Sequence, residues 1–139
     1  MAFLSSLDIS GTALTAQKFR MKVISENLAN AQTTRTENGE PYRRKLVVLS
    51  QRVDGFRKEL GQVLAGVEVT QVLEDGDDFK VEYNPDHPDA DEAGYVRLPN
   101  VNTLEEMVDL MSASRSYEAN VTAFNAMKQL ASTALNIGK

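Results

Sequence analysis

Apolar residues recur every seven positions through the first thirty residues of the chain, and no proline interrupts them. In a helix this spacing keeps the residues on one side, so that a long helix can pack lengthwise against a partner. The seam consists of Leu7, Leu14, Met21 and Leu28, with Ile24 as an intermediate step. We predict a helix from Phe3 to Ala31, about 43 Å long at 1.5 Å per residue.

The last third of the chain has the same design. Asn102 and Thr103 are candidate N-caps, because Glu105 and Glu106 each lie three residues beyond one of them. The apolar seam that follows consists of Leu110, Tyr117, Val121 and Phe124, and Met127 and Leu130 widen it near the end. A helix that is apolar on more than one side needs more than one partner.

Two long helices at opposite ends of a short chain are expected to pack against each other as a coiled-coil-like pair. The predicted contacts join Leu14, Met21 and Leu28 to Tyr117, Val121 and Phe124. Within this seam, Met21→Leu is expected to be mild because it nearly conserves volume. By contrast, Leu28→Asp is expected to prevent assembly because it buries an unpaired charge.

The middle of the chain alternates instead of following the helical spacing. An Asn-Gly turn at residues 38–39 precedes a predicted strand from Tyr42 to Gln51, and alternating segments follow at 67–73, 79–83 and 94–98. Gly76, between aspartates, provides a turn between the second and third segments. The predicted fold class is α+β, with long helical ends and a small middle β lobe of three or four short strands. The expected division is an N-terminal helix at 1–34, the β lobe at 35–101 and a C-terminal helix at 102–139.

Composition excludes several classes of function. The chain has no cysteine and one histidine, His87, which makes a zinc site improbable. Residues 66–109 carry thirteen acidic and two basic side chains, which argues against nucleic acid binding. No apolar run exceeds four residues, so we expect neither a transmembrane span nor a cleavable signal peptide.

No motif for catalysis, a cofactor or a metal ion stands out in the sequence. There is no nucleophile with a base, no glycine-rich phosphate loop and no clustered ligand set, so we expect neither an enzyme nor a cofactor. Lys18, Arg20 and Lys22 could face anionic lipid, but beside a heptad seam they are better interpreted as a solvated face. The residues by themselves therefore indicate an assembly or interaction protein.

Specific sequence motifs at both ends and in the middle resemble a known family. Residues 10–17 (SGTALTAQ) and 25–31 (SENLANA) resemble the N-terminal signature of flagellar rod and hook proteins. Residues 39–45, 84–91, 94–101 and 111–120 are similar to the proximal-rod subunits of that family. The motif residues to which the resemblance attaches a role are Asn27, Asn30, Pro41, Tyr42, Tyr95, Ser114, Arg115 and Asn120.

The resemblance implies a structural subunit of the proximal rod, which assembles helically into the torque-transmitting drive shaft and export channel of the bacterial flagellum. It implies copies of itself, other rod subunits and the protein at the junction of rod base and export gate as partners. It also implies export to the periplasm through the flagellar type III apparatus. Because helices without their tertiary partners are marginal, we expect the terminal segments to be disordered before assembly. The runner-up is another axial role in the same family, and a soluble helical adaptor or export chaperone is the alternative from a different class.

The asparagines of the two motif helices leave two interpretations open. Asn27, Asn30 and Asn120 either form hydrogen bonds between subunits and fix their register, as buried asparagines do in coiled coils, or they are exposed amides without a role.

Overall fold

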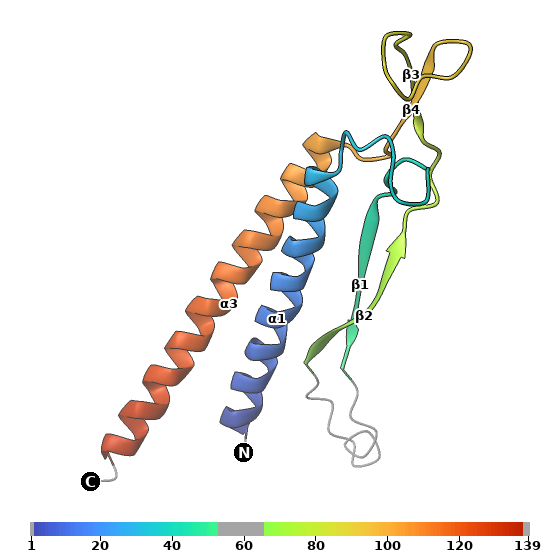
Figure 1. The fold of residues 1–139 in the computed structure, drawn as a ribbon. Helices are drawn as coiled ribbons and strands as arrows, with labels where there is room; N and C mark the ends of the chain where they lie inside the picture. The colour runs from blue at the N-terminus through green and yellow to red at the C-terminus, as the bar shows by residue number, and fades with distance from the viewer. Residues whose placement is uncertain (1, 53–65, 138–139) are drawn as a thin grey trace.

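Two long helices run antiparallel and side by side, so that both ends of the chain lie at the same end of the molecule (Figure 1). This computed structural model describes residues 2–52 and 66–137. Helix α1 spans Ala2–Ala29 and helix α3 spans Thr103–Ile137. At 1.5 Å per residue they are about 42 Å and 52 Å long.

The helix boundaries follow local signals in the sequence. Helix α1 ends at Ala29, where the next residue, Asn30, donates both its backbone N–H and its side-chain amide to Glu26 O. Helix α3 begins after Asn102, whose Oδ1 accepts from the Leu104 N–H at 3.2 Å and whose Nδ2 donates to Glu105 Oε1 at 2.9 Å. Asn102 is therefore the N-cap, and it shares a capping contact with a carboxylate three residues on.

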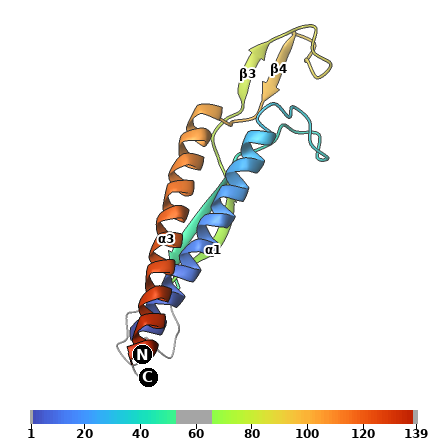
Figure 2. The ribbon, with the colours of Figure 1, turned by 90° about the vertical axis from the view of Figure 1, so that its left-hand side faces the viewer.

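A first hairpin lies along α1 on the side away from α3. Strand β1 (Lys45–Gln51) pairs antiparallel with β2 (Val67–Glu74), with a bulge between Val48 and Leu49. Figures 1 and 2 together show the resulting order of layers: α3, then α1, then the hairpin. Helix α1 thus lies in the middle and packs on two sides.

A second hairpin forms the far tip of the molecule. Strand β3 (Lys80–Tyr83) pairs antiparallel with β4 (Tyr95–Leu98), and the two sheets share no strand. The turn at Gly94 has φ of 83°, a conformation that glycine adopts without strain. We call β3, β4 and the loop 84–94 between them the tip hairpin.

The α+β prediction with two helical ends and short middle strands is confirmed, but the middle is two hairpins with different neighbours. The first strand was expected from Tyr42 and starts at Lys45. The reason lies in the backbone hydrogen bonds: Tyr42 N–H donates to Thr33 O and Arg44 N–H to Asn100 Oδ1, so neither is free for a ladder. The turn at Gly76 connects β2 to β3 without pairing them.

The core lies where α1 meets its two neighbours. Its buried apolar side chains come from α1, from the segment before β1, from β4, from the linker after β4 and from α3: Ala16, Val23, Ile24, Tyr42, Val96, Val101 and Ala113. Three polar residues are buried with them: Ser10, Asn27 and Glu106. The small apolar core and the buried polar groups together decide how the elements are placed.

Candidate functional site

The seam between α1 and α3 is set in register by two polar contacts. Asn27 Nδ2 donates to Glu106 Oε2 at 3.0 Å, and a terminal guanidinium nitrogen of Arg20 lies 3.7 Å from Asp109 Oδ1. Because the helices are antiparallel, each step toward the start of α1 corresponds to a step toward the end of α3. These contacts therefore fix which turns of the two helices lie level with each other.

In that register the two heptad series match. The turns that lie level are those of Met21 and Leu110, of Leu14 and Tyr117, and of Leu7 and Phe124, and all six side chains are half-buried. The predicted contacts of Met21 and Leu28 are wrong within the chain. Met21 is level with Leu110, seven residues or about 10 Å before Tyr117. Leu28 lies beside the first turn of α3, and Phe124 is eighteen residues beyond Glu106, about 27 Å along the helix. Periodicity identifies the face of a helix but not its register, which here depends on the polar contacts.

The other predicted packing residues divide into covered and uncovered ones. Ile24 is buried, and Val121 and Met127 are half-buried, whereas Leu130 is 66% exposed. Helix α3 is seven residues longer than α1, so its last turns extend past the start of α1 (Figure 1). We call residues 130–137 the overhang; Leu130 and Leu135 are exposed there.

The first turns of α3 carry a second uncovered face. Leu104, Met107, Val108 and Met111 follow the i, i+3, i+4, i+7 spacing of one helix side, and each is more than half exposed. We call these four residues the outer stripe. Contiguous exposed apolar residues of this kind mark protein interaction sites. The outer stripe and the overhang lie at opposite ends of the same helix.

A buried polar cluster connects the helix pair to the first hairpin. Asn27 is 1% exposed, and each polar atom of its amide is bonded within the chain. Its Oδ1 accepts from Tyr42 Oη at 3.0 Å and from the Lys45 N–H at 2.9 Å, and its Nδ2 donates to Lys45 O and Glu106 Oε2. Asn27 is therefore neither an idle exposed amide nor a free donor for another subunit, and both interpretations from the sequence are wrong for this residue.

Glu106 and Arg44 complete the cluster. Glu106 is also 1% exposed, and its Oε1 lies 2.6 Å from Arg44 Nε. A terminal nitrogen of the same guanidinium lies 3.4 Å from Asp75 Oδ2, just after β2. We call five residues the polar joint, because they bring together both helices, the start of β1 and the end of β2: Asn27, Tyr42, Arg44, Asp75 and Glu106.

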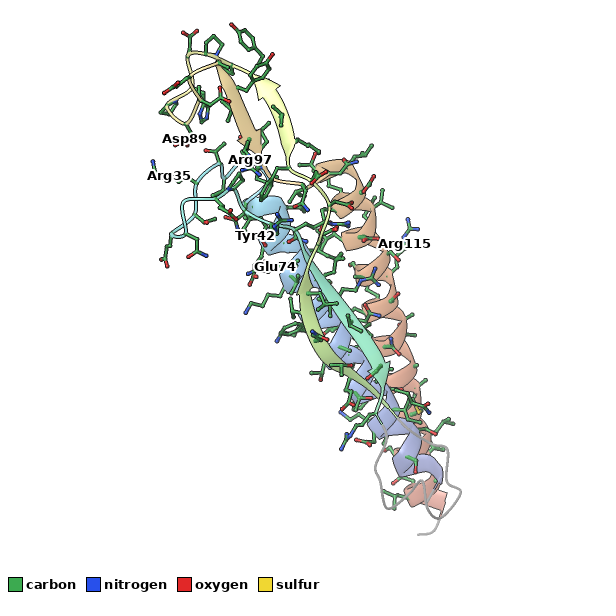
Figure 3. The ribbon with its side chains drawn as sticks, turned by 90° about the vertical axis from the view of Figure 1, so that its right-hand side faces the viewer. Arg35, Tyr42, Glu74, Asp89, Arg97 and Arg115 are labelled. Atoms are coloured by element: carbon green, nitrogen blue, oxygen red, sulfur yellow. The ribbon has the colours of Figure 1, made fainter. Side chains whose placement is uncertain are left out.

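The protonation states in the polar joint follow from these neighbours. Burial, and then the nearby carboxylates of Glu26, Glu106 and Glu74, raise the pKa of Tyr42 to about 12, which keeps its hydroxyl protonated as a donor to Asn27. Burial by itself lowers the pKa of Arg44, but the bonds to Glu106 and Asp75 outweigh it and raise that pKa above its ordinary value. Arg44 is thus charged wherever the protein is folded. Figure 3 shows Tyr42 and Glu74 near the meeting point of the helices and hairpins.

The remaining motif residues take several local roles. Pro41 is buried next to Tyr42, Ser114 is half-buried, and Arg115 projects from α3 into solvent (Figure 3). Tyr95 lies on the tip hairpin with its ring edge-on to Tyr83. Asn30 and Asn120 donate to carbonyls of their own helices, Glu26 O at 2.9 Å and Ser116 O at 2.8 Å. Contacts of these two with other subunits remain a prediction.

Sequence reasoning missed a second stripe on α1. The side of α1 that faces the first hairpin carries residues spaced four, three, four and four apart: Thr12, Ala16, Phe19, Val23 and Asn27. The spacing was visible in the sequence, but Thr12 and Asn27 made the stripe less apolar than the seam. The buried role of Glu106 had no signal, since an acidic residue in a first helical turn is usually a solvated one.

No chemistry-bearing cluster was found in the described part of the chain. Within residues 2–52 and 66–137, no three His, Asp or Glu side chains are grouped so that they could hold a metal ion. None of the helices described has the length and apolarity needed to cross a bilayer. The site that this geometry presents is an assembly surface: a helix seam, two uncovered apolar faces and a buried joint.

Comparison with known proteins identifies the family. The sequence model described as flagella basal body rod protein matches residues 7–35, and that of the flagellar basal body rod FlgEFG protein C-terminal region matches residues 92–137. The flagellar basal-body rod protein FlgC of Bacillus subtilis (strain 168) is 49% identical over the whole of both chains. The FlgC proteins of Salmonella typhimurium (strain LT2) and Borreliella burgdorferi are 44% and 43% identical, over 98% or more of each chain. The chain therefore belongs to the FlgC family of flagellar basal-body rod proteins, and it is a structural subunit of the rod rather than an enzyme.

Proposed function

We propose that the chain is a subunit of the proximal rod, where it assembles helically with copies of itself and with other rod subunits around a central export channel. The observation that supports this most is the pair of uncovered apolar faces, the outer stripe and the overhang. They lie at opposite ends of α3, so a contact between them joins different surfaces of two molecules. Contacts of this heterologous kind build open helical assemblies, or rings where the rotation closes, rather than isologous dimers.

The transmission of torque follows from the same arrangement. Helices packed side by side make many small apolar contacts, and helical symmetry repeats them around the shaft. The polar joint would keep the first hairpin in a fixed position relative to the helix pair while load passes through the seam. In this proposal α1 and α3 line the shaft, and the tip hairpin lies farther from its axis.

The position of the chain in the basal body belongs to the same proposal. The subunit would leave the cytoplasm through the flagellar type III export apparatus and assemble in the periplasm. Its neighbours there would be other rod subunits and the protein at the junction between the rod base and the export gate. Membership of the FlgC family supports this placement.

Electron microscopy of purified basal bodies tests the proposal. A strain without this gene, complemented with the intact gene, is compared with strains that carry Met107→Glu or Met107→Leu. Met107 is exposed in the isolated chain, so neither change should alter the free energy of unfolding by more than about 0.5 kcal/mol. We expect Met107→Glu to leave cells without rod, hook and filament, because a charge would be buried in the contact between subunits, while Met107→Leu restores swimming.

Circular dichroism and thermal unfolding of the purified Met107→Glu and Met107→Leu variants are the control for folding, and we expect both to match the unsubstituted chain. Complete rods and swimming in the Met107→Glu strain would contradict a subunit contact at the outer stripe. Complete hook–basal bodies in the strain without the gene would contradict the rod function itself.

A further inference from the structure

The tip hairpin has one covered face and one open face. Neighbours across two antiparallel strands share a face, so Val81, Tyr83, Tyr95 and Arg97 lie together, and Glu82 and Val96 lie on the opposite face. Val96 is buried against the rest of the molecule, whereas Val81 and Tyr83 are 63% and 64% exposed. The rings of Tyr83 and Tyr95 lie edge to face with centroids 5.3 Å apart. The open face is therefore apolar and aromatic at Val81, Tyr83 and Tyr95, and its one cation, Arg97, stacks on the Phe79 ring.

This open face is surrounded by negative charge. Residues 75–97 contain eight acidic and two basic side chains. Asp75, Asp89 and Asp91 are held within the chain, by Arg44, by Thr34 and Arg35, and by backbone N–H groups respectively. The other five carboxylates of residues 75–97 are exposed and form no ion pair with any described residue: Asp77, Asp78, Glu82, Asp86 and Glu92.

The two cations of the tip offset only part of that charge, since two basic against eight acidic side chains leave residues 75–97 at a net −6, and neither cation forms an ion pair among the described residues. Lys80 Nζ donates to Val101 O at 2.7 Å. The Arg97 guanidinium lies 4.9 Å from the centroid of the Phe79 ring, and Arg43 lies 4.4 Å from the same ring. Tyr83 and Tyr95 have no such cation among the described residues. A two-stranded sheet of four residues a strand is marginal by itself, so a partner on its open face would stabilise it.

We propose that the open face of the tip hairpin docks onto a basic surface of a different protein chain of the basal body. This rests on the proposed rod function and adds a partner chemistry to it. Arginine or lysine side chains of the partner would lie over the rings of Tyr83 and Tyr95 and pair with carboxylates such as Asp86 and Glu92. The combination of aromatic faces and unpaired carboxylates favours cations over an apolar or acidic partner.

A second copy of this chain is a poor occupant for electrostatic reasons. Its own tip is acidic, and two tips repel. The chain as a whole has a formal net charge of −5, so a second copy meets net repulsion even though it exposes cations such as Lys22 and Arg115. A different chain with an excess of exposed arginine and lysine has neither obstacle.

Site-specific photo-crosslinking in assembled basal bodies tests the docking. A benzophenone amino acid replaces Tyr83, or Gln71 as an exposed control on the first hairpin, and the crosslinked peptides are identified by mass spectrometry. At position 83 we expect a crosslink to another basal-body protein, at a segment where arginine and lysine outnumber acidic residues. A crosslink to a second copy, a crosslink to a neutral or acidic segment, or no crosslink in basal bodies that contain the variant would each overturn the proposal.

Charge variants provide a second readout. Asp86→Lys combined with Glu92→Lys should lower the yield of the crosslink at position 83 about tenfold, whereas Asp86→Asn with Glu92→Gln should lower it less. An unchanged yield in the charge-reversal variant would overturn the proposal. Electron microscopy of the same preparations distinguishes failure of the proposed rod function from failure of the proposed docking. Rods that lack this chain would count against the rod function. Complete rods without the crosslink would count only against docking at the tip.

Discussion

Glu106 is a carboxylate that the fold encloses almost completely, and one guanidinium neutralises its charge. Arg44 Nε lies 2.6 Å from Oε1, while Asn27 occupies Oε2. Removing one member of a buried ion pair costs more than the pair contributes, because the remaining charge stays buried without a partner. The polar joint is therefore the place where a single substitution should have the largest effect on folding.

We expect Glu106→Ala to lower the free energy of unfolding by about 3 kcal/mol, the low end for a broken buried pair, because Asp75 still contacts Arg44. At this chain length that corresponds to a Tm lower by about 10 °C in a thermal unfolding experiment. The matched control is Asp109→Ala, which breaks the exposed contact with Arg20 and should cost about 0.5 kcal/mol. Similar Tm values for the two variants would show that the joint does not hold the fold together.

The pKa of Tyr42 predicts a loss of stability in alkali. Its value of about 12 lies above the ordinary 10, so the folded state favours the protonated phenol. The associated stability is fully present below pH 10 and is lost as the pH rises from 10 to 12. Denaturant midpoints measured from pH 9 to 11 should fall in the native protein and fall less in Tyr42→Phe. Tyr83→Phe, at an exposed ring, should follow the native curve; if Tyr42→Phe follows it too, Tyr42 is not the titrating group.

At the scale of elements, the first hairpin is positioned by close approach to α1. A Cβ built on Gly66 would overlap Thr12 Oγ1 and lie 3.0 Å from Thr12 Cβ. The same hydroxyl accepts a hydrogen bond from the Val67 N–H at 3.2 Å. Residue 66 therefore has to be small for β2 to reach the helix.

We expect Gly66→Ala to destabilise the protein by about 1–3 kcal/mol, as overpacking usually does. The start of β2 should move away from α1, and the Val67 amide should exchange its hydrogen faster in a hydrogen-exchange experiment. Gly76→Ala is the control, since a Cβ there meets nothing within 4 Å. Unchanged protection of Val67 in Gly66→Ala would show that the contact with Thr12 does not position the hairpin.

Elements were easier to predict from the sequence than their pairing. Both ends of α1 and the start of α3 lie within two residues of their expected positions, because helix periodicity and the cap at Asn102 are local signals. The strands were also located, but the sequence could not show that β1 pairs with β2 and β3 with β4. Strand pairing depends on contacts far apart in the chain, and the start of β1 depends on Asn100, whose side chain takes the Arg44 N–H.

At the scale of the whole molecule, the chain is an elongated unit whose apolar faces are not all satisfied within itself. The rod family assembles with other rod components, and the outer stripe and the overhang are the described surfaces most in need of a partner. The seam between α1 and α3 remains a proposed part of that assembly. It is half-buried in the single chain, so neighbours can still add to it.

Substitutions in the seam between α1 and α3 should therefore affect rod formation. We expect Leu28→Asp to prevent rod formation, because it places an unpaired charge among packed side chains, whereas Met21→Leu should cost less than about 1.5 kcal/mol and support swimming. Electron microscopy of basal bodies and swarm diameter measure both variants. Normal rods with Leu28→Asp would show that this end of the seam is not part of the assembly contact.

The sequence by itself determined the local facts: two amphipathic helices, four short extended segments, an acidic middle and family motifs at both ends. Each depends on spacing or residue type within a few turns of chain. Only the tertiary structure decided the register of the helix pair, the two separate hairpins and the buried role of Asn27 and Glu106. The physical reason is that a buried polar group must find its hydrogen-bond partners wherever the fold supplies them, and Asn27 finds its partners eighteen and seventy-nine residues away.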